Sequence, residues 1–288
     1  MIKRLYSLLF LLSMISFSKA QESINLYPNG LLNSIDGVSS EGNTPEFYFY
    51  KPTAENVKKF VFLIIPGGGY SRVAMGHEGH DVAQRLRDLG YASFVLRYRL
   101  PVDSQMLDKR IAPIQDAQTA LLYIKTHADR LGYDSNNVVV IGFSAGGHLA
   151  STLSTHFETS YIGDVKNKSF LRPDYSVLVY PVITMAPGIT HSGSKNNLIG
   201  SSAKEEDMFR FSNENNVTSD TPPTYLMHAE DDKVVPFQNV VMYKEKLDKF
   251  QIDNRLYVYN KGGHGFGMVN KLEAGDWFLD MLNWLNNK

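Results

Sequence analysis

Short apolar runs alternate with segments of helical periodicity along most of this chain. The runs are rich in β-branched and aromatic residues, or they alternate apolar with polar positions, as strands do. Strands are predicted at residues 24–27, 46–50, 59–65, 91–98, 137–141, 175–181, 224–228 and 255–259. Helices are predicted at residues 78–89, 111–131, 237–250 and 274–284, and after residue 147. Because strands that alternate with helices build parallel sheets, the pattern predicts an α/β fold whose mostly parallel central sheet is flanked by helices on both faces.

The first twenty residues have a different pattern. Lys3 and Arg4 precede a mostly apolar run over residues 5–17, and small residues follow up to Ala20. This run is too short to span a bilayer, and its flanks are those of a secretory signal rather than of a buried helix. We therefore expect residues 1–20 to be a signal peptide that is cleaved near Ala20, which predicts a secreted or periplasmic bacterial protein without a membrane anchor.

Residues 21–288 are expected to form a single domain. The length of 288 residues suits one large α/β domain or two small ones, and no Pro-, Gly- or Ser-rich linker divides the chain. The least regular part, residues 184–222, is rich in Ser, Asn and Gly. We expect it to be an insertion above the sheet that contacts substrate, because α/β folds place their active sites at the carboxyl ends of the strands.

Composition and charge exclude several classes of chemistry. The chain has no cysteine, so disulfides, thiolate metal sites and a cysteine nucleophile are all excluded. A formal net charge of −1 gives no electrostatic reason to expect nucleic acid as a partner. The hydrophobic fraction of 43% is ordinary for a globular protein with a substantial core.

One motif joins a predicted strand to a predicted helix. Gly142-Phe143-Ser144-Ala145-Gly146 follows the β-branched run 137–141 and precedes a small, apolar segment. A bare Gly-x-Ser-x-Gly occurs often by chance, but a strand-to-helix turn of this sequence strains the serine backbone and lifts its hydroxyl clear of the sheet. Gly142 and Gly146 are expected because a Cβ at either position would collide with neighbouring backbone. The pattern predicts Ser144 as a nucleophile.

A serine nucleophile needs a base, and the base needs an acid that orients it. In chains of this topology the acid follows the serine in sequence and the histidine comes last. Asp231 and Asp232 both follow the predicted strand 224–228. We favour Asp232 because it lies in the turn directly ahead of the next helix, and Asp231 remains the alternative.

His264 is the predicted base. It follows the last strand, and four glycines surround it in Gly262-Gly263-His264-Gly265-Phe266-Gly267, so the loop can fold back toward Ser144. The other seven histidines are interpreted as structural. Among them His148 comes shortly after the serine, and a role in helix packing is favoured for it over contact with the site.

A glycine-rich segment predicts an oxyanion hole. Pro66-Gly67-Gly68-Gly69-Tyr70 ends a buried strand and leaves backbone N–H groups free to bind a developing negative charge. We expect the donors to be the N–H of Gly68 or Gly69 together with that of Ala145, the residue after the nucleophile. A phosphate-binding loop is the alternative, but no Lys-Ser/Thr follows and the dinucleotide spacing is absent.

Together these motifs resemble the α/β-hydrolase superfamily, and more narrowly its secreted esterase/lipase branch with acetyl xylan esterases and related carbohydrate esterases. The resemblance covers about residues 45–285. It rests on Pro66-Gly67-Gly68-Gly69-Tyr70, Gly90-Tyr91-Ala92, Leu96-Arg97-Tyr98-Arg99-Leu100, Gly142-Phe143-Ser144-Ala145-Gly146-Gly147-His148, Pro222-Pro223-Thr224, Asp231-Asp232, Val235-Pro236 and Gly262-Gly263-His264-Gly265-Phe266-Gly267. Two positions depart from the family pattern: Pro66 stands where esterases usually have His, and Ala229 where Gly is common.

The resemblance implies a serine carboxylesterase that uses a Ser-His-Asp triad and an acyl-enzyme, without a metal or organic cofactor. It also implies a short acyl group, acetyl above all, on a small ester or an acetylated plant or microbial polysaccharide such as xylan. A serine peptidase of the same fold and a non-catalytic carbohydrate-binding protein are the alternatives. The natural ester, the limit on acyl length and the oligomeric state stay open.

Overall fold

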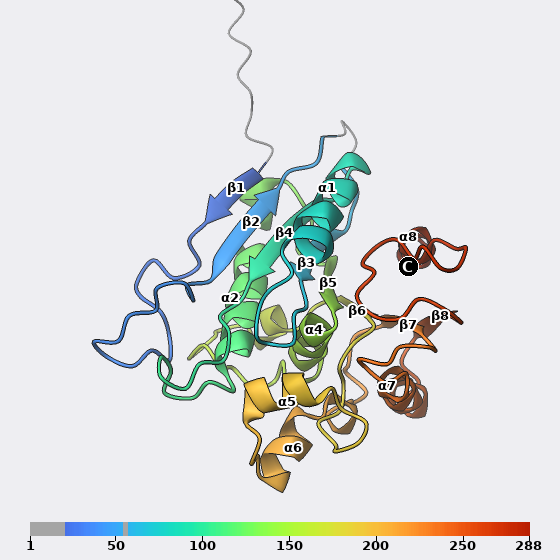
Figure 1. The fold of residues 1–288 in the computed structure, drawn as a ribbon. Coiled ribbons are helices and arrows are strands. Elements are labelled where there is room, and N and C mark those ends of the chain that lie inside the picture. Colours follow the sequence, from blue (N-terminus) through green and yellow to red (C-terminus); the bar gives the residue numbers. More distant parts are fainter. Residues whose placement is uncertain (1–20, 54–56) are drawn as a thin grey trace, which may run out of the picture.

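The computed structural model describes residues 21–53 and 57–288. Its centre is an eight-stranded sheet in the order β1-β2-β4-β3-β5-β6-β7-β8 (Figure 1). The strands are β1 (Gln21–Ile24), β2 (Glu46–Tyr50), β3 (Val61–Ile65), β4 (Ala92–Arg97), β5 (Val138–Phe143), β6 (Tyr175–Val179), β7 (Thr224–Ala229) and β8 (Asn254–Tyr259). β2 pairs antiparallel with β1 and β4, and every other neighbouring pair is parallel. The predicted signal peptide lies outside the described residues and stays a prediction.

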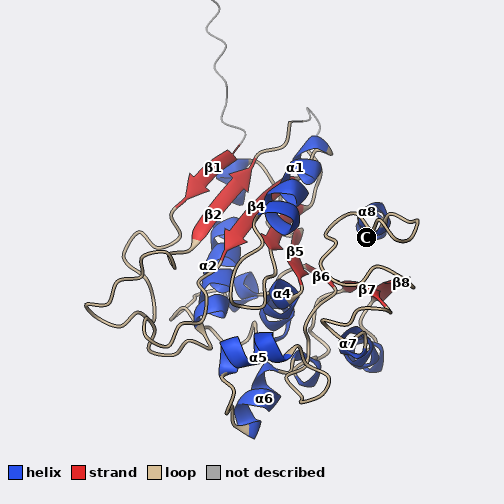
Figure 2. Ribbon diagram, viewed as in Figure 1, coloured by secondary structure: helices blue, strands red, loops and turns tan. Residues whose placement is uncertain are grey.

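Helices cover both faces of the sheet (Figure 2). They are α1 (Asp81–Asp88), α2 (Ala112–Thr126), α3 (Ala128–Leu131), α4 (Ala145–Thr155), α5 (Ser192–Ile199), α6 (Glu205–Phe211), α7 (Gln238–Lys249) and α8 (Trp277–Asn286). Three further helical turns are the π-helical η1 (Gly76–His80) and the 3₁₀ turns η2 (Lys168–Leu171) and η3 (Asn213–Asn215). None of the helices in the described part of the chain has the length and apolar character that a bilayer span requires.

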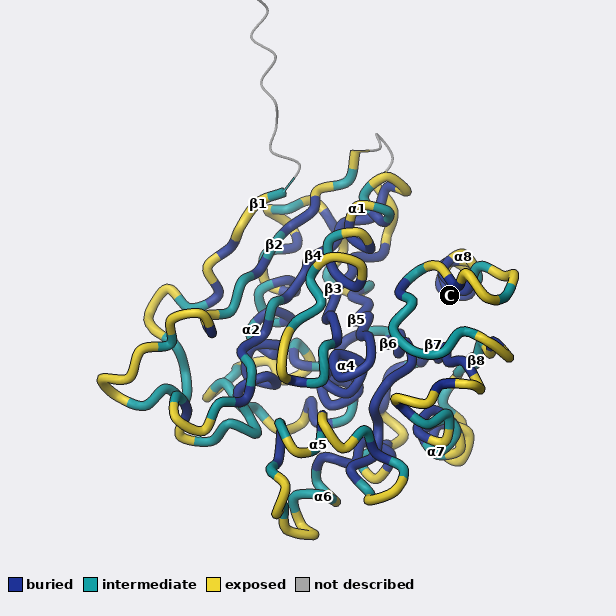
Figure 3. The backbone as a smooth tube through the Cα atoms, viewed as in Figure 1, coloured by how far each residue is buried: buried dark blue, intermediate teal, exposed yellow. Residues whose placement is uncertain are grey.

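The strands alternate their side chains between two hydrophobic layers. In β3, Leu63 and Ile65 pack with residues of α2, α4 and α7 on one face. Phe62 and Ile64 pack on the other face with residues of α1 and α8. Helix α4, which follows the serine motif, is buried along nearly its whole length (Figure 3). The predicted α/β fold with a mostly parallel, doubly covered sheet is thereby confirmed.

Two predicted elements differ from the structure. The single helix predicted over 111–131 is wrong, because α2 ends at Thr126 and α3 begins at Ala128. At this break the Thr126 hydroxyl donates to the Leu122 carbonyl at 2.7 Å, a local side-chain bond that competes with regular helix geometry. The first strand lies at Gln21–Ile24 rather than at 24–27. It ends where the Asn25 side chain accepts the Tyr27 N–H at 2.9 Å, which forms a turn.

The segment 184–222 was expected to be irregular, but it contains α5, α6 and η3. The buried side chain of Asn213 attaches it to α4 by donating to the Ser151 hydroxyl at 2.7 Å and to the His148 carbonyl at 3.1 Å. An ion pair also attaches the segment to the rest of the fold, because Arg110 donates to Asp207 of α6 at 2.6 Å. The insertion is therefore an ordered part of the fold.

Candidate active site

Ser144 lies at the sharp turn between β5 and α4, at the carboxyl edge of the sheet. Its backbone has φ 52° and ψ −119°, a conformation that costs energy for any residue with a side chain. The close packing around it requires glycine, since a Cβ on Gly146 would collide with the carbonyl oxygens of Ile65 and Pro66. A Cβ on Gly142 would likewise collide with the carbonyl of Gly146. The turn thus has the strained geometry that the motif predicts.

Three side chains that are far apart in the sequence meet at this edge. The Oγ of Ser144 lies 2.9 Å from Nε2 of His264. The Nδ1 of the same imidazole lies 2.6 Å from Oδ2 of Asp232. The Asp232 side chain is fully buried, and that of His264 is 14% exposed. Serine hydroxyl, imidazole and carboxylate therefore form one continuous hydrogen-bonded chain.

The surroundings of Asp232 keep its carboxylate ionised. Its Oδ1 accepts the backbone N–H groups of Val234 at 2.8 Å and Val235 at 2.9 Å. Burial by itself would raise the pKa of Asp232, but the hydrogen bonds from His228 and His264 outweigh burial and hold that pKa well below its usual value. An ionised carboxylate only accepts hydrogen bonds, so Nδ1 of His264 carries the proton and Nε2 accepts from Ser144.

The neighbouring Asp231 has a different position. Its Oδ1 accepts the N–H groups of Gly262 at 2.9 Å and Gly263 at 2.8 Å, in the loop that carries His264. Asp231 therefore holds this loop through its backbone, and it is Asp232 that contacts the imidazole. The structure thus places Asp232 against the imidazole and Asp231 against the loop backbone, and the choice of Asp232 as the acid stays a prediction.

The glycine-rich segment after β3 lies against the serine turn. The N–H of Gly67 donates to Oε2 of Glu78 at 2.8 Å. Within residues 21–53 and 57–288, the N–H groups of Gly68, Gly69 and Ala145 have no acceptor. The predicted oxyanion donors are thus the N–H groups that stay open, and Ala145 begins α4, where the helix dipole favours negative charge.

His191 also lies beside the glycine-rich segment, although it was interpreted as structural. A Cβ built on Gly69 would lie 3.6 Å from Cε1 of its ring. Its Nδ1 accepts the N–H of Ser194 at 3.2 Å, so the proton of the neutral ring is on Nε2. Burial, and then the charge of nearby His264, lower the pKa of His191. No local pattern marks this histidine, because only the insertion brings it to the site.

A second histidine contacts the carboxylate of Asp232. The Nε2 of His228 lies 3.1 Å from Oδ2 of Asp232 and 3.0 Å from the Val235 carbonyl, and the residue is fully buried. Both partners are acceptors, so this nitrogen carries its proton and donates. In the sequence, this contact is indicated by the spacing of four residues between His228 and Asp232 across the end of β7.

His148 has the packing role that was favoured for it. Its Nδ1 lies 2.8 Å from the hydroxyl of Tyr70, and its Nε2 lies 2.8 Å from the carbonyl of Phe211. Full burial lowers the pKa of His148 to about 4, so the ring is neutral at pH 7. It links α4 to both the glycine-rich segment and the insertion.

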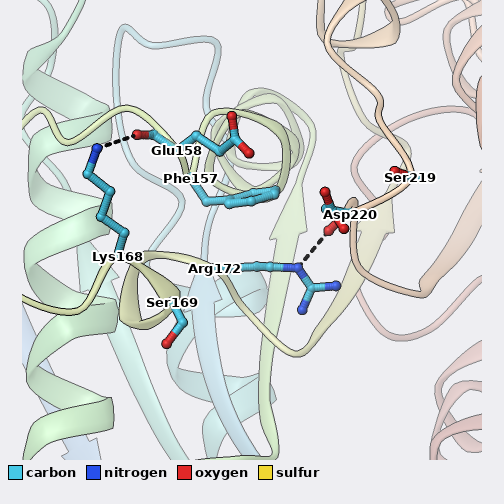
Figure 4. A pocket seen from close by; sticks show the side chains of 7 residues that line it. All are labelled: Phe157, Glu158, Lys168, Ser169, Arg172, Ser219 and Asp220. Atoms are coloured by element: carbon cyan, nitrogen blue, oxygen red, sulfur yellow. Dashed lines mark hydrogen bonds between the residues drawn. The ribbon is translucent and has the colours of Figure 1, made fainter.

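A cavity of about 690 Å³ lies away from Ser144. Its lining includes Phe157 and Glu158, which follow the far end of α4, and Ser219 and Asp220, which precede β7 (Figure 4). This cavity is therefore at the amino edge of the sheet.

Across the residues that the structure describes, no group of three or more His, Cys, Asp or Glu side chains is arranged to hold a metal ion.

A mostly parallel sheet with a serine at the strand-to-helix turn after β5 defines an α/β-hydrolase. Residues 48–247 match the model of the BD-FAE family, and the chain belongs to this family. The resemblance to α/β-hydrolases that the motifs indicate is thereby confirmed.

Similar proteins support the same class. An acetyl ester-xyloside bifunctional hydrolase from Caldicellulosiruptor lactoaceticus has a crystal structure that superimposes with a TM-score of 0.81 at 32% identity, over 92% of this chain and 96% of that one. A protein named endo-1,4-beta-xylanase B from Butyrivibrio fibrisolvens is 32% identical over 85% of this chain. An acetylxylan esterase from Xylanibacter ruminicola is 32% identical over 81% of it. The chain spans 38% and 46% of the lengths of these last two relatives, respectively.

The buried His148 predicts a pH-dependent stability. An unfolded histidine titrates near pH 6.5, whereas the folded ring titrates at about 4. Between these values only the unfolded chain binds the proton, so stability falls as the pH falls through this window and by on the order of 3 kcal/mol in all. Urea unfolding of wild type and His148→Gln at pH 7, 6, 5 and 4 measures the effect.

The glutamine keeps one donor and one acceptor but does not titrate in this range. The difference in unfolding free energy between wild type and variant should therefore shift against the wild type as the pH falls. A difference that stays constant from pH 7 to pH 4 would show that this histidine is not buried in its neutral form.

Proposed function

We propose that this chain is a serine ester hydrolase that cleaves short-chain esters, acetyl esters of carbohydrates in particular. The observation that carries the proposal is the unbroken hydrogen-bonded chain from Ser144 Oγ through His264 to Asp232, with distances of 2.9 and 2.6 Å. Such a chain activates a hydroxyl that is otherwise a weak nucleophile at neutral pH.

In the proposed mechanism, Nε2 of His264 takes the proton of Ser144 as its Oγ attacks the ester carbonyl. The oxygen that becomes negative is bound by the N–H of Gly68 or Gly69 and that of Ala145. The imidazolium then gives its proton to the leaving alcohol, and the acyl group remains on the serine. His264 next activates a water molecule that hydrolyses this acyl-enzyme.

Asp232 has two tasks in this scheme. It holds the proton on Nδ1 of His264, which leaves Nε2 free to act as the base, and it stabilises the imidazolium once it forms. The fully buried carboxylate and its lowered pKa support both roles, because Asp232 keeps its negative charge at neutral pH.

The proposed substrate class rests on the relatives. An acetylxylan esterase and an acetyl ester-xyloside hydrolase are among the similar proteins, each at 32% identity. The open N–H groups and the imidazole of His191 beside Gly69 supply polar contacts for a sugar ester. A polysaccharide substrate also fits the export that residues 1–20 predict.

The two adjacent aspartates provide a matched pair of variants. In Asp232→Asn, the N–H groups of Val234 and Val235 hold the amide oxygen, so the amide NH₂ faces His264 and forces its proton onto Nε2. We expect kcat for p-nitrophenyl acetate to fall on the order of 10⁴-fold, as such tautomer changes do in triads.

In Asp231→Asn the amide oxygen still accepts from Gly262 and Gly263, and kcat should fall less than about tenfold. Steady-state kinetics of both variants measure the contrast, and equal losses would remove Asp232 from the triad.

The reaction class is tested with a panel of substrates. We expect wild type to hydrolyse p-nitrophenyl acetate and to release acetate from acetylated xylan, and Ser144→Ala to do neither. Release of p-nitroaniline from aminoacyl anilides without cleavage of esters would assign a serine peptidase instead. Binding of xylan by an inert wild-type protein would assign a carbohydrate-binding protein.

A further inference from the structure

Glu78 is a buried carboxylate that the proposed mechanism does not use. It lies in the π-helical turn η1, 3% exposed, between the glycine-rich segment and the core. One oxygen accepts the Gly67 N–H at 2.8 Å and the other accepts the Tyr180 hydroxyl at 2.7 Å. Among the described residues, its one possible charge partner is the largely exposed imidazole of His77, whose Nε2 lies 3.7 Å from Oε1 and which is a cation only when protonated. A buried carboxylate without a close cation is costly, and this cost calls for a role.

The Gly67 side of this carboxylate reaches the nucleophile. A Cβ built on Gly67 would lie 2.8 Å from Cβ of Ser144, so the Gly67 backbone abuts the serine directly. The next two residues carry the open N–H groups of the predicted oxyanion hole. A displacement of Gly67 would therefore move these N–H groups relative to Ser144.

The other partner of Glu78, Tyr180, contacts the predicted base His264. Tyr180 follows β6, and its hydroxyl accepts the N–H of Gly267 at 2.9 Å. Its ring centroid lies 4.9 Å from that of His264, so the phenol packs against the imidazole. Burial, and then the charge on Glu78, raise the pKa of Tyr180 well above its usual value, which keeps the hydroxyl protonated as a donor to Glu78.

We propose that Glu78 is a positioning residue that couples the oxyanion segment to the His264 loop across Ser144. One carboxylate holds Gly67 on one side and, through Tyr180, the loop at Gly267 on the other. Because the acceptor is charged, both hydrogen bonds are stronger than neutral ones. They therefore hold the two segments in a fixed position relative to each other. The inference rests on the proposed function, since it assigns Glu78 a part in the same site.

The proposal predicts a specific kinetic effect. Oxyanion donors stabilise charge that develops in the transition state, so a small displacement lowers kcat while the binding of uncharged substrate changes little. In Glu78→Gln the amide oxygen accepts from only one of the two donors and the NH₂ group faces the other, so a charged acceptor no longer holds both segments. We expect kcat for p-nitrophenyl acetate to fall about 10- to 100-fold with KM within about threefold, because the cost of one lost oxyanion donor sets the upper limit.

Tyr180→Phe removes only a hydroxyl and tests the other half of the bridge. We expect a loss of kcat in the same direction, and a double variant whose loss is smaller than the product of the two single losses. Losses that multiply independently would overturn the coupling. If Glu78→Gln does not fold, Tyr180→Phe alone carries the test, with an unchanged kcat as the contradicting result.

A control variant separates positioning from a general loss of stability. Asp174 also accepts a backbone N–H, from Val138 at 2.8 Å, and a side-chain donor, Lys125 at 3.1 Å. Both contacts lie at the amino end of β5, at the edge opposite the site. Asp174→Asn should lower the free energy of unfolding in urea and leave kcat within about twofold.

The outcomes distinguish the two proposals. An inactive wild type would contradict the proposed function, whereas an active wild type with unchanged kcat in Glu78→Gln would overturn only the role of Glu78. A change confined to KM, or an equal fall of kcat in Asp174→Asn, would also overturn that role.

Discussion

The rest of the site depends on the hydrogen bonds that the Asp232 carboxylate accepts. Four donors meet on its two buried oxygens: the N–H groups of Val234 and Val235, and the imidazoles of His228 and His264. The backbone donors fix the carboxylate, which in turn fixes the His264 ring and its protonated nitrogen. The orientation of the His264 ring toward Ser144 thus originates in a turn of the chain after β7.

The sheet supplies the second constraint. Parallel strands bring their carboxyl ends to one edge, so segments separated by 120 residues, as Ser144 and His264 are, lie side by side. The sheet alone does not set angstrom-scale distances between loops. Contacts between the loops do so: Asp231 holds the glycines before His264, and Asn197 of α5 donates to the Gly69 carbonyl at 2.8 Å. These polar contacts between loops hold the side chains of the site at their observed distances.

The strands and the chain order of the site residues could be predicted because they depend on local pattern. All predicted strands after the first are present, since continuous β-branched runs such as 137–141 have few alternatives to a buried strand. The interruption at His127 and the helices in 184–222 could not be predicted, because side-chain bonds and tertiary packing decide them. The contacts of Glu78 and His191 are likewise properties of the folded chain, and nothing in their neighbouring sequence distinguishes these two residues from structural ones.

The central claim is that His264 and Asp232 activate Ser144, and covalent labelling tests it most directly. Wild type and His264→Ala are treated with a fluorophosphonate that reacts with activated serines, and the adduct is located by peptide mass spectrometry. We predict one adduct per chain on the peptide that contains Ser144, and a loss of labelling in His264→Ala. An adduct on another residue, or labelling of the variant at the wild-type rate, would contradict the claim.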